Sequence, residues 1–233
     1  MPCPRDPSRT DASGRAYAGS QRQIQTYVNE RPRVLTRAIA DALRPYRLDP
    51  LAVRWVSPLE ADKYSEYQDG EFLEIVGAGH LVPKLIVFWP RGGPCWDALA
   101  RVEGGGCVLV EAKSHIPEVY GNGCAATGHS LSLIRSSVAR TQAWLGARPD
   151  ADWLGPLYQS ANRLAHLYFL REIGNIEAFL ISVYFTGDPH PHFSTSRQQW
   201  DDGIRLVNEQ LGIANPLPYT ASVFLVAASD RPG

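Results

Sequence analysis

Residues 107–113 (CVLVEAK) constrain the fold most, because apolar side chains occupy both alternating faces of this strand pattern as far as Val110. A strand that is apolar on both faces is covered on both sides and lies inside its sheet. Glu111 and Lys113 then follow on one face. Charged groups at the end of a buried strand need a partner, a ligand or water. The segment therefore predicts a central strand with a polar site at its end.

The remaining elements are predicted from apolar periodicity and turn signals. Helices are expected at 57–76, 127–145, 153–173 and 197–211, and further strands at 85–90, 96–102, 178–185 and 221–227. The first of these helices begins with Ser57-Pro58-Leu59-Glu60, which has the form of a capping box with proline in the first turn. This order of elements predicts an α/β layered domain with a mixed sheet.

The chain divides into three regions by composition. Residues 1–19 are rich in Pro, Arg, Asp, Ser and Gly, have little to bury, and are predicted to form a disordered tail. Residues 20–50 are predicted to form a helical arm, and residues 51–233 the main domain. Residues 1–50 carry nine Arg against five acidic residues, and we interpret this excess as a solvated helix face.

The balance of charge excludes some classes of protein. The 233 residues include 23 Lys and Arg against 24 Asp and Glu, a net charge of −1. This excludes a polybasic nucleic-acid-binding protein but permits a local basic groove. The first twenty residues lack the apolar core of a signal peptide, and no apolar run reaches the roughly 20 residues of a membrane helix. The four cysteines lack metal-binding spacing and are predicted to be reduced thiols of a cytoplasmic protein with no membrane partner.

Asp97 lies on the strand before residues 107–113, and the hairpin register places it near the charged pair. If residues 104–106 form the turn, paired residue numbers sum to 210 and Asp97 lies opposite Lys113. The even sum puts Asp97, Glu111 and Lys113 on one face. The two carboxylates are then diagonal neighbours about 7–8 Å apart at the backbone, and can converge on one Mg²⁺ ion. A two-residue turn would instead put Asp97 on the opposite face.

Asp97, a turn and Glu111-Ala112-Lys113 on a strand, behind a helix carrying Glu66, resemble the PD-(D/E)xK nuclease superfamily over about residues 57–188. The segments FWPRGGPCWDALA, LVEAKSHIPE and YQSANRLAHLYFLRE are similar to an uncharacterised bacterial group within it. The chain departs from the family pattern in one respect, because its proline lies at Pro94, three residues before the aspartate. The resemblance implies a restriction-endonuclease-like three-layer α/β/α fold with a central mixed sheet.

The resemblance also implies a metal-dependent phosphodiesterase that uses Mg²⁺ or Mn²⁺ to polarise the scissile phosphate and supply a nucleophilic water. It assigns the ion four ligands: Asp97, Glu111, the Ala112 carbonyl and Glu66. Glu71 is a rival to Glu66 on the same predicted helix. Lys113 would orient that water or help to deprotonate it. The expected partner is nucleic acid, with DNA favoured, and a homodimer remains open.

Polar side chains on the predicted 153–173 helix are candidates for binding the substrate. Gln159, Asn162, Arg163 and His166 fall on one face, which could turn towards the cleft with Gln159 contacting the site and Arg163 a phosphate. A solvated face is equally compatible with this pattern. His115 continues the face of Glu111 and Lys113 if the strand extends that far, and is then a further candidate to touch substrate.

Other readings of the same residues stay open. Asp97, Lys113 and Glu111 could form an ion-pair cluster without catalysis. The chain could then be a fold relative that binds nucleic acid or protein without cleaving it, or else a hydrolase of a small phosphorylated substrate. The near-neutral charge favours these alternatives, because duplex binding usually needs a basic surface. The intact set of Asp, Glu and Lys favours the nuclease.

Overall fold

A computed structural model of the chain describes residues 3–4, 6–189 and 194–229, which contain five strands and seven α-helices. The strands are β1 (Val53–Ser57), β2 (Ala98–Val102), β3 (Gly106–Lys113), β4 (Ala178–Thr186) and β5 (Thr220–Val226). The helices are α1 (Gly19–Asn29), α2 (Pro32–Ala42), α3 (Asp69–Val76), α4 (Val82–Phe88), α5 (Gly128–Leu145), α6 (Tyr158–Tyr168) and α7 (Arg197–Gln210). A π-helical turn, Phe169–Ile173, continues α6.

The strands form one open mixed sheet in the order β1-β2-β3-β4-β5. β1, β2 and β3 run antiparallel to their neighbours, whereas β3, β4 and β5 are parallel. β3 is therefore the middle strand, and it is buried continuously from Gly106 to Val110. The prediction of a central strand is confirmed.

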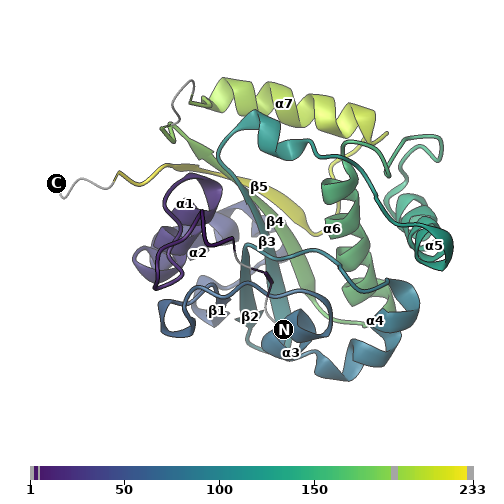
Figure 1. Cartoon of the computed structure of the whole chain (residues 1–233), viewed down its shortest axis with the longest axis horizontal. Coiled ribbons are helices and arrows are strands. Elements are labelled where there is room, and N and C mark those ends of the chain that lie inside the picture. Colours follow the sequence, from purple (N-terminus) through teal and green to yellow (C-terminus); the bar gives the residue numbers. More distant parts are fainter. Residues whose placement is uncertain (1–2, 5, 190–193, 230–233) are drawn as a thin grey trace.

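Helices cover both faces of this sheet (Figure 1). α1 and α2 pack on the face that carries Val108 and Val110, whereas α3, α4, α5 and α6 contribute to the core on the face that carries Cys107 and Leu109. α7 lies on this second side, where Val207 packs at the edge of the core. An α/β fold with a mixed sheet is confirmed, and the arrangement is compatible with three layers.

Residues 20–50 form a layer of the fold and not a separate arm. Ile24 of α1 and Leu35 and Ile39 of α2 have no exposed surface and belong to the core on one sheet face. The apolar periodicity predicted helix here, but it could not show that the sheet is what buries the apolar side.

Residues 1–19, expected to be disordered, make defined contacts where the structure describes them. Thr10 and Ala16 form an antiparallel bridge, and Ala16 is buried. Cys3 is joined to Cys95 by a disulfide with a Cα–Cα distance of 6.1 Å, so the prediction of reduced thiols is wrong for this pair. The two residues are 92 positions apart, and local spacing cannot reveal such a pairing.

The predicted helix at 57–76 is wrong in its first half. Ser57 is the last residue of β1, and the Ser57–Pro58 peptide bond is cis. The buried Ser57 hydroxyl donates to the Ser65 carbonyl at 2.8 Å and does not cap a helix. α3 begins only at Asp69, so Glu66 lies in irregular chain before it.

The predicted strand at 85–90 is also wrong, because its first four residues belong to α4 and the other two follow that helix. Leu85 and Phe88 are buried, whereas Ile86 and Val87 are 66% and 73% exposed. That spacing of three is helical, and a short apolar run does not distinguish helix from strand by itself. β1 takes the expected place of this strand beside β2.

The later elements agree with the sequence. The helices predicted at 127–145 and 197–211 and the strands at 178–185 and 221–227 are confirmed to within one residue at each end. The predicted helix at 153–173 starts later, at Tyr158, and ends in the π-helical turn.

The register of the β2–β3 hairpin differs from the predicted one. Ala98 pairs with Val110 and Val102 with Gly106, so paired numbers sum to 208 and residues 103–105 form the loop. Extended by one residue, this register aligns Asp97 with Glu111 and not with Lys113. The sum is still even, so the parity that places these side chains on one face is retained.

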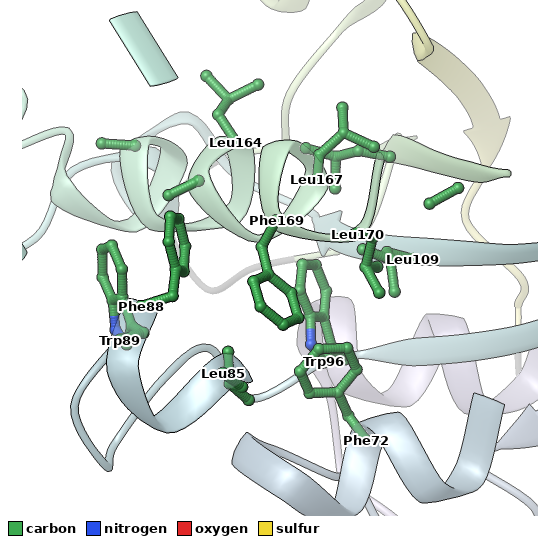
Figure 2. Close-up of a cluster of buried hydrophobic side chains, with 14 of the residues drawn as sticks. Phe72, Leu85, Phe88, Trp89, Trp96, Leu109, Leu164, Leu167, Phe169 and Leu170 are labelled. Carbon is green, nitrogen blue, oxygen red and sulfur yellow. The ribbon is translucent and has the colours of Figure 1, made fainter. Parts of the chain in front are cut away.

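Aromatic packing under α6 holds the chain that leads to Asp97. Trp96 is fully buried, with its ring centroid 5.8 Å from that of Phe72. Figure 2 shows these two rings and Phe169 on the side of α6 that faces the core. The residue before Asp97 is thus anchored between α3 and α6. None of the helices in the described ranges is long and apolar enough to span a membrane.

The packing of α2 on the sheet predicts unequal costs for two neighbouring substitutions. Leu35 has no exposed surface, whereas Val34 is 53% exposed. We expect Leu35→Ala to lower the free energy of unfolding by about 2–5 kcal/mol, and Val34→Ala by about 0.5 kcal/mol or less. Urea unfolding of both variants measures this. Equal costs would show that α2 is not a structural layer.

Candidate functional site

The candidate site lies where β3, the chain before β2 and the first turns of α6 meet. Glu111 and Lys113 lie at the C-terminal end of β3, at the edge of the sheet where the parallel strands β3, β4 and β5 end. Ligand sites of open α/β sheets occur at such carboxyl ends. In the parallel register, Ser182 and Tyr184 of β4 lie beside Glu111 and Lys113.

Asp97 is held against β3 by a main-chain hydrogen bond. Its Oδ2 accepts from the Ala112 N–H at 2.7 Å. Burial raises the pKa of the Asp97 carboxyl well above its usual range, and the nearby charges of Glu111 and Glu66 raise it further. Lys113 and the Ala112 N–H act in the opposite direction but do not outweigh these effects. Asp97 is therefore a carboxyl group whose surroundings disfavour its charge.

Glu111 differs from Asp97, because two neighbouring cations stabilise its negative charge. Lys113 Nζ lies 2.6 Å from Glu111 Oε1, and Arg163 Nε donates to Glu111 Oε2 at 2.6 Å. The three side chains are only 12–16% exposed. Burial would raise the pKa of Glu111, but Arg163 and Lys113 outweigh it and the pKa is lowered. Burial would lower the pKa of Lys113, yet Glu111 and Asp97 raise it, so Lys113 remains an ammonium ion.

Arg163 forms its hydrogen bonds within this cluster and is not free to contact a phosphate. Besides Glu111, its guanidinium donates to the Cys95 carbonyl at 3.3 Å and to Asn162 Oδ1 at 3.1 Å. Asn162 is 6% exposed, so it positions Arg163 and does not face a substrate. The carbonyl of Gln159 accepts from Arg163 at 3.4 Å. The polar face of α6 thus points towards the site and not to solvent. However, Asn162 and Arg163 form hydrogen bonds within the protein.

Glu66 and His115 take places that differ from those predicted. Glu66 is on no helix, and Gln21 of α1 donates to its Oε1 at 3.0 Å. It remains close enough to raise the pKa of Asp97. His115 follows the end of β3 and is 6% exposed, with its ring nitrogens 3.1 Å from Glu118 Oε1 and 3.3 Å from the Asp188 carbonyl. His115 is therefore a structural residue outside the cluster.

A hollow of about 470 Å³, which we call the N-terminal hollow, opens on one side of the cluster. Its floor is formed by Glu66, Asp97, Lys113 and Gln159, and its roof by residues that include Cys3, Asp6, Arg9 and Thr10. The disulfide to Cys95 and a hydrogen bond from the Cys3 N–H to the Glu66 carbonyl, 2.9 Å long, attach the roof. The sequence offered no signal for this cover.

A second hollow of about 470 Å³, the α7 cavity, opens on the other side. Glu111, Lys113, Gln159 and Arg163 line one end of it, and α7 and β4 line the rest. Lys113 and Gln159 therefore border both hollows. Ser182 and Tyr184, which sequence reasoning missed, could have been found from the period-two pattern of 178–185 together with a parallel β3–β4 register.

The ion that the resemblance implies, Mg²⁺ or Mn²⁺, needs oxygen ligands at the cluster. Within the described ranges, no three side chains of His, Cys, Asp or Glu are grouped closely enough to hold a metal. Mg²⁺, however, is usually bound by one or two carboxylates together with waters and substrate phosphates. Asp97 and Glu111 fit this smaller set, since Glu111 lies near enough to raise the pKa of Asp97. Glu111 would have to release part of its hold on Lys113 or Arg163.

Comparisons of the chain with protein-family models, with curated proteins and with solved structures found no match. The resemblance to the PD-(D/E)xK nucleases therefore depends on the residues themselves.

The raised pKa of Asp97 predicts how pH changes stability in metal-free buffer. Between the ordinary pKa of Asp, about 4, and its raised value in the folded protein, the folded state keeps a proton that the unfolded state has lost. The contribution of Asp97 to the free energy of unfolding therefore falls as pH rises. Asp97→Asn removes this loss, and its side-chain oxygen can still accept from Ala112. We expect a higher melting temperature than wild type at pH 8, and a difference that shrinks towards pH 4.

Thermal unfolding followed by circular dichroism between pH 4 and pH 8 measures this difference. Asp150→Asn is the control, because the Asp150 side chain is 76% exposed and its loss should leave no such pH dependence. A melting temperature of Asp97→Asn at or below that of wild type at pH 8 would contradict the assignment.

Glu111→Gln should have the opposite effect on stability. It leaves Lys113 and Arg163 largely buried without their counter-charge, and breaking a buried pair in this way costs about 3–5 kcal/mol. As a control, Asp201→Asn breaks an exposed pair with Arg197 and should cost about 1 kcal/mol or less. Urea unfolding compares the two. A Glu111→Gln variant as stable as wild type would show that the two cations need no buried anion.

Proposed function

We propose that this protein is a metal-dependent nuclease that hydrolyses phosphodiester bonds of nucleic acid, with DNA as the favoured substrate. The observation that carries the proposal is the convergence of Asp97, Glu111 and Lys113 at the carboxyl end of the central strand. A mixed five-stranded sheet with helices on both faces supports a restriction-endonuclease-like fold as part of the same proposal.

Mg²⁺ or Mn²⁺ would be held by Asp97, Glu111 and the Ala112 carbonyl, with Glu66 near enough to act through water. When bound, the ion would polarise the scissile phosphate and activate the attacking water. In the reaction a water oxygen would bond to phosphorus and lose one proton to the solvent. The bond from phosphorus to one sugar oxygen would break, and that oxygen would take up a proton from the solvent.

Lys113 would orient the water and offset the negative charge that develops on the phosphate. In the metal-free protein Glu111 and Asp97 raise the pKa of Lys113, which keeps it as an ammonium ion before the metal binds. Arg163 would hold Glu111 in place and is a positioning residue, and Gln159, which borders both hollows, would contact the substrate.

One observation favours a second candidate, a nuclease-fold module that binds without cleaving. Both oxygens of Glu111 are already engaged by Lys113 and Arg163, as they would be in a purely structural ion-pair cluster. A cytoplasmic location also remains a prediction, and the Cys3–Cys95 disulfide counts against it, since disulfides persist mainly in oxidising compartments.

Cleavage of labelled single-stranded and duplex DNA in Mg²⁺, Mn²⁺ and EDTA tests the proposal. We expect cleavage with either metal, none in EDTA, and none by Asp97→Asn. We expect Lys113→Arg to fold but to lose cleavage by about a hundredfold, because a planar guanidinium replaces a compact ammonium and small displacements at the reacting group cost about this much.

Lys84→Arg is the matched control, because Lys84 is exposed, contacts the Ile173 carbonyl and lies outside both hollows. Its cleavage rate should equal that of wild type. Cleavage that survives both EDTA and Asp97→Asn would rule out the mechanism, and intact binding of DNA without any cleavage would favour the module.

A further inference from the structure

The α7 cavity has two chemically different ends. At one end Lys113 and Arg163 supply positive charge, partly balanced by Glu111. The remaining walls carry aliphatic residues, which include Val207, Leu211 and Ile213, interspersed with polar ones such as Ser182, Tyr184 and Ser222. The volume of about 470 Å³ lies in the range of about 300–1,000 Å³ typical of pockets that hold small ligands.

A polar side chain is placed among these walls without a partner. Asn208 of α7 lines the cavity, is half-buried, and makes no side-chain hydrogen bond within the described part of the chain. Side-chain amides can donate to and accept from the edge of a nucleobase at the same time. The cavity thus offers a cationic end, walls of mixed aliphatic and hydroxyl side chains, and the amides of Gln159, Asn208 and Asn215, which match the phosphate, the sugar and base faces, and the base edge of a nucleotide.

Lys113 also borders the N-terminal hollow on the other side of the cluster. The N-terminal hollow has its roof attached by the Cys3–Cys95 disulfide and by the hydrogen bond from Cys3 to Glu66. Gln25 reinforces it by accepting from the Ala16 N–H at 2.8 Å and donating to the Gly14 carbonyl at 3.3 Å. Both hollows reach Lys113, and the volume of about 470 Å³ on the α7 side is in the range of one small ligand and too small for a stretch of duplex.

We propose that the α7 cavity binds one nucleotide unit, with its phosphate at Lys113 and its base among the aliphatic residues of α7. The inference rests on the proposed nuclease function and deepens it, because it names the substrate as a strand end or an unpaired nucleotide and not an intact duplex. Extruding a paired base costs unstacking energy, which is lowest when the base is already unpaired.

Two neighbouring residues of α7 provide a matched test. Val207 lines the cavity, whereas Leu206 is 44% exposed and does not. Val207→Trp should fill the cavity and lower kcat/KM on a linear single-stranded oligonucleotide at least tenfold, whereas Leu206→Trp should stay within twofold of wild type. Ile213→Phe fills the cavity from another wall and should act like Val207→Trp, so a failure of one variant to fold does not decide the result.

Three unlabelled DNA topologies identify the source of the nucleotide. Cleavage of linear but not circular single strands would identify a strand end, and cleavage of both would identify any unpaired nucleotide. A relaxed, covalently closed duplex circle should resist. Cleavage of that circle as fast as the single strands, or equal rates for Val207→Trp, Ile213→Phe and Leu206→Trp, would overturn the proposal.

Calorimetric titration with thymidine and adenosine 5′-monophosphates in EDTA separates this inference from the proposed function. We expect binding by wild type and Leu206→Trp, and at least tenfold weaker binding by Val207→Trp and Ile213→Phe. If no DNA is cleaved under any condition but this binding pattern holds, the nuclease proposal fails and the nucleotide cavity stands. Absence of binding by wild type would overturn the cavity assignment, even if DNA were cleaved.

Discussion

The carboxylate of Glu111 is the interaction on which the rest of the structure around the site depends. One of its oxygens pairs with Lys113 on its own strand and the other with Arg163 on α6. A carboxylate this deeply placed would be costly without such partners. Arg163 also donates to the Cys95 carbonyl, so a single buried anion joins the central strand, α6 and the chain leading to Asp97.

The surroundings of the two carboxyl groups in the cluster shift their pKa values in opposite directions. The pKa of Glu111 is lowered because two cations outweigh the effect of its burial. The pKa of Asp97 is raised because burial and two other carboxylates outweigh Lys113. Structural ion-pair networks also shift pKa values, and Glu111 alone would be compatible with one. Asp97 is different, since burial and two neighbouring carboxylates disfavour its charged form more than Lys113 and the Ala112 N–H favour it. Strongly shifted pKa values of this kind cluster at functional sites, which supports the proposed role of Asp97.

Properties that depend on local periodicity could be predicted from the sequence, and properties that depend on distant contacts could not. The central position of β3 and the shared face of Asp97, Glu111 and Lys113 follow from alternation and from an even register, which survived a two-residue error in the sum. The capping-box pattern wrongly predicted a helix start at Ser57, because Ser57 ends β1 and its hydroxyl donates to the Ser65 carbonyl. The target of Arg163 depends on where α6 lies across the sheet, which no pattern within α6 records.

The near-neutral net charge of the chain bears on how many phosphates the proposed site could bind at once. Binding along a duplex neutralises many phosphates with Lys and Arg and needs an extended basic surface, which a net charge of −1 does not favour. A site that holds one phosphate needs only local positive charge. Lys113 lies at one end of the α7 cavity, where Arg163 adds positive charge through its pairing with Glu111. The composition that argues against an ordinary duplex-binding protein is therefore compatible with a nuclease that admits its substrate one nucleotide at a time.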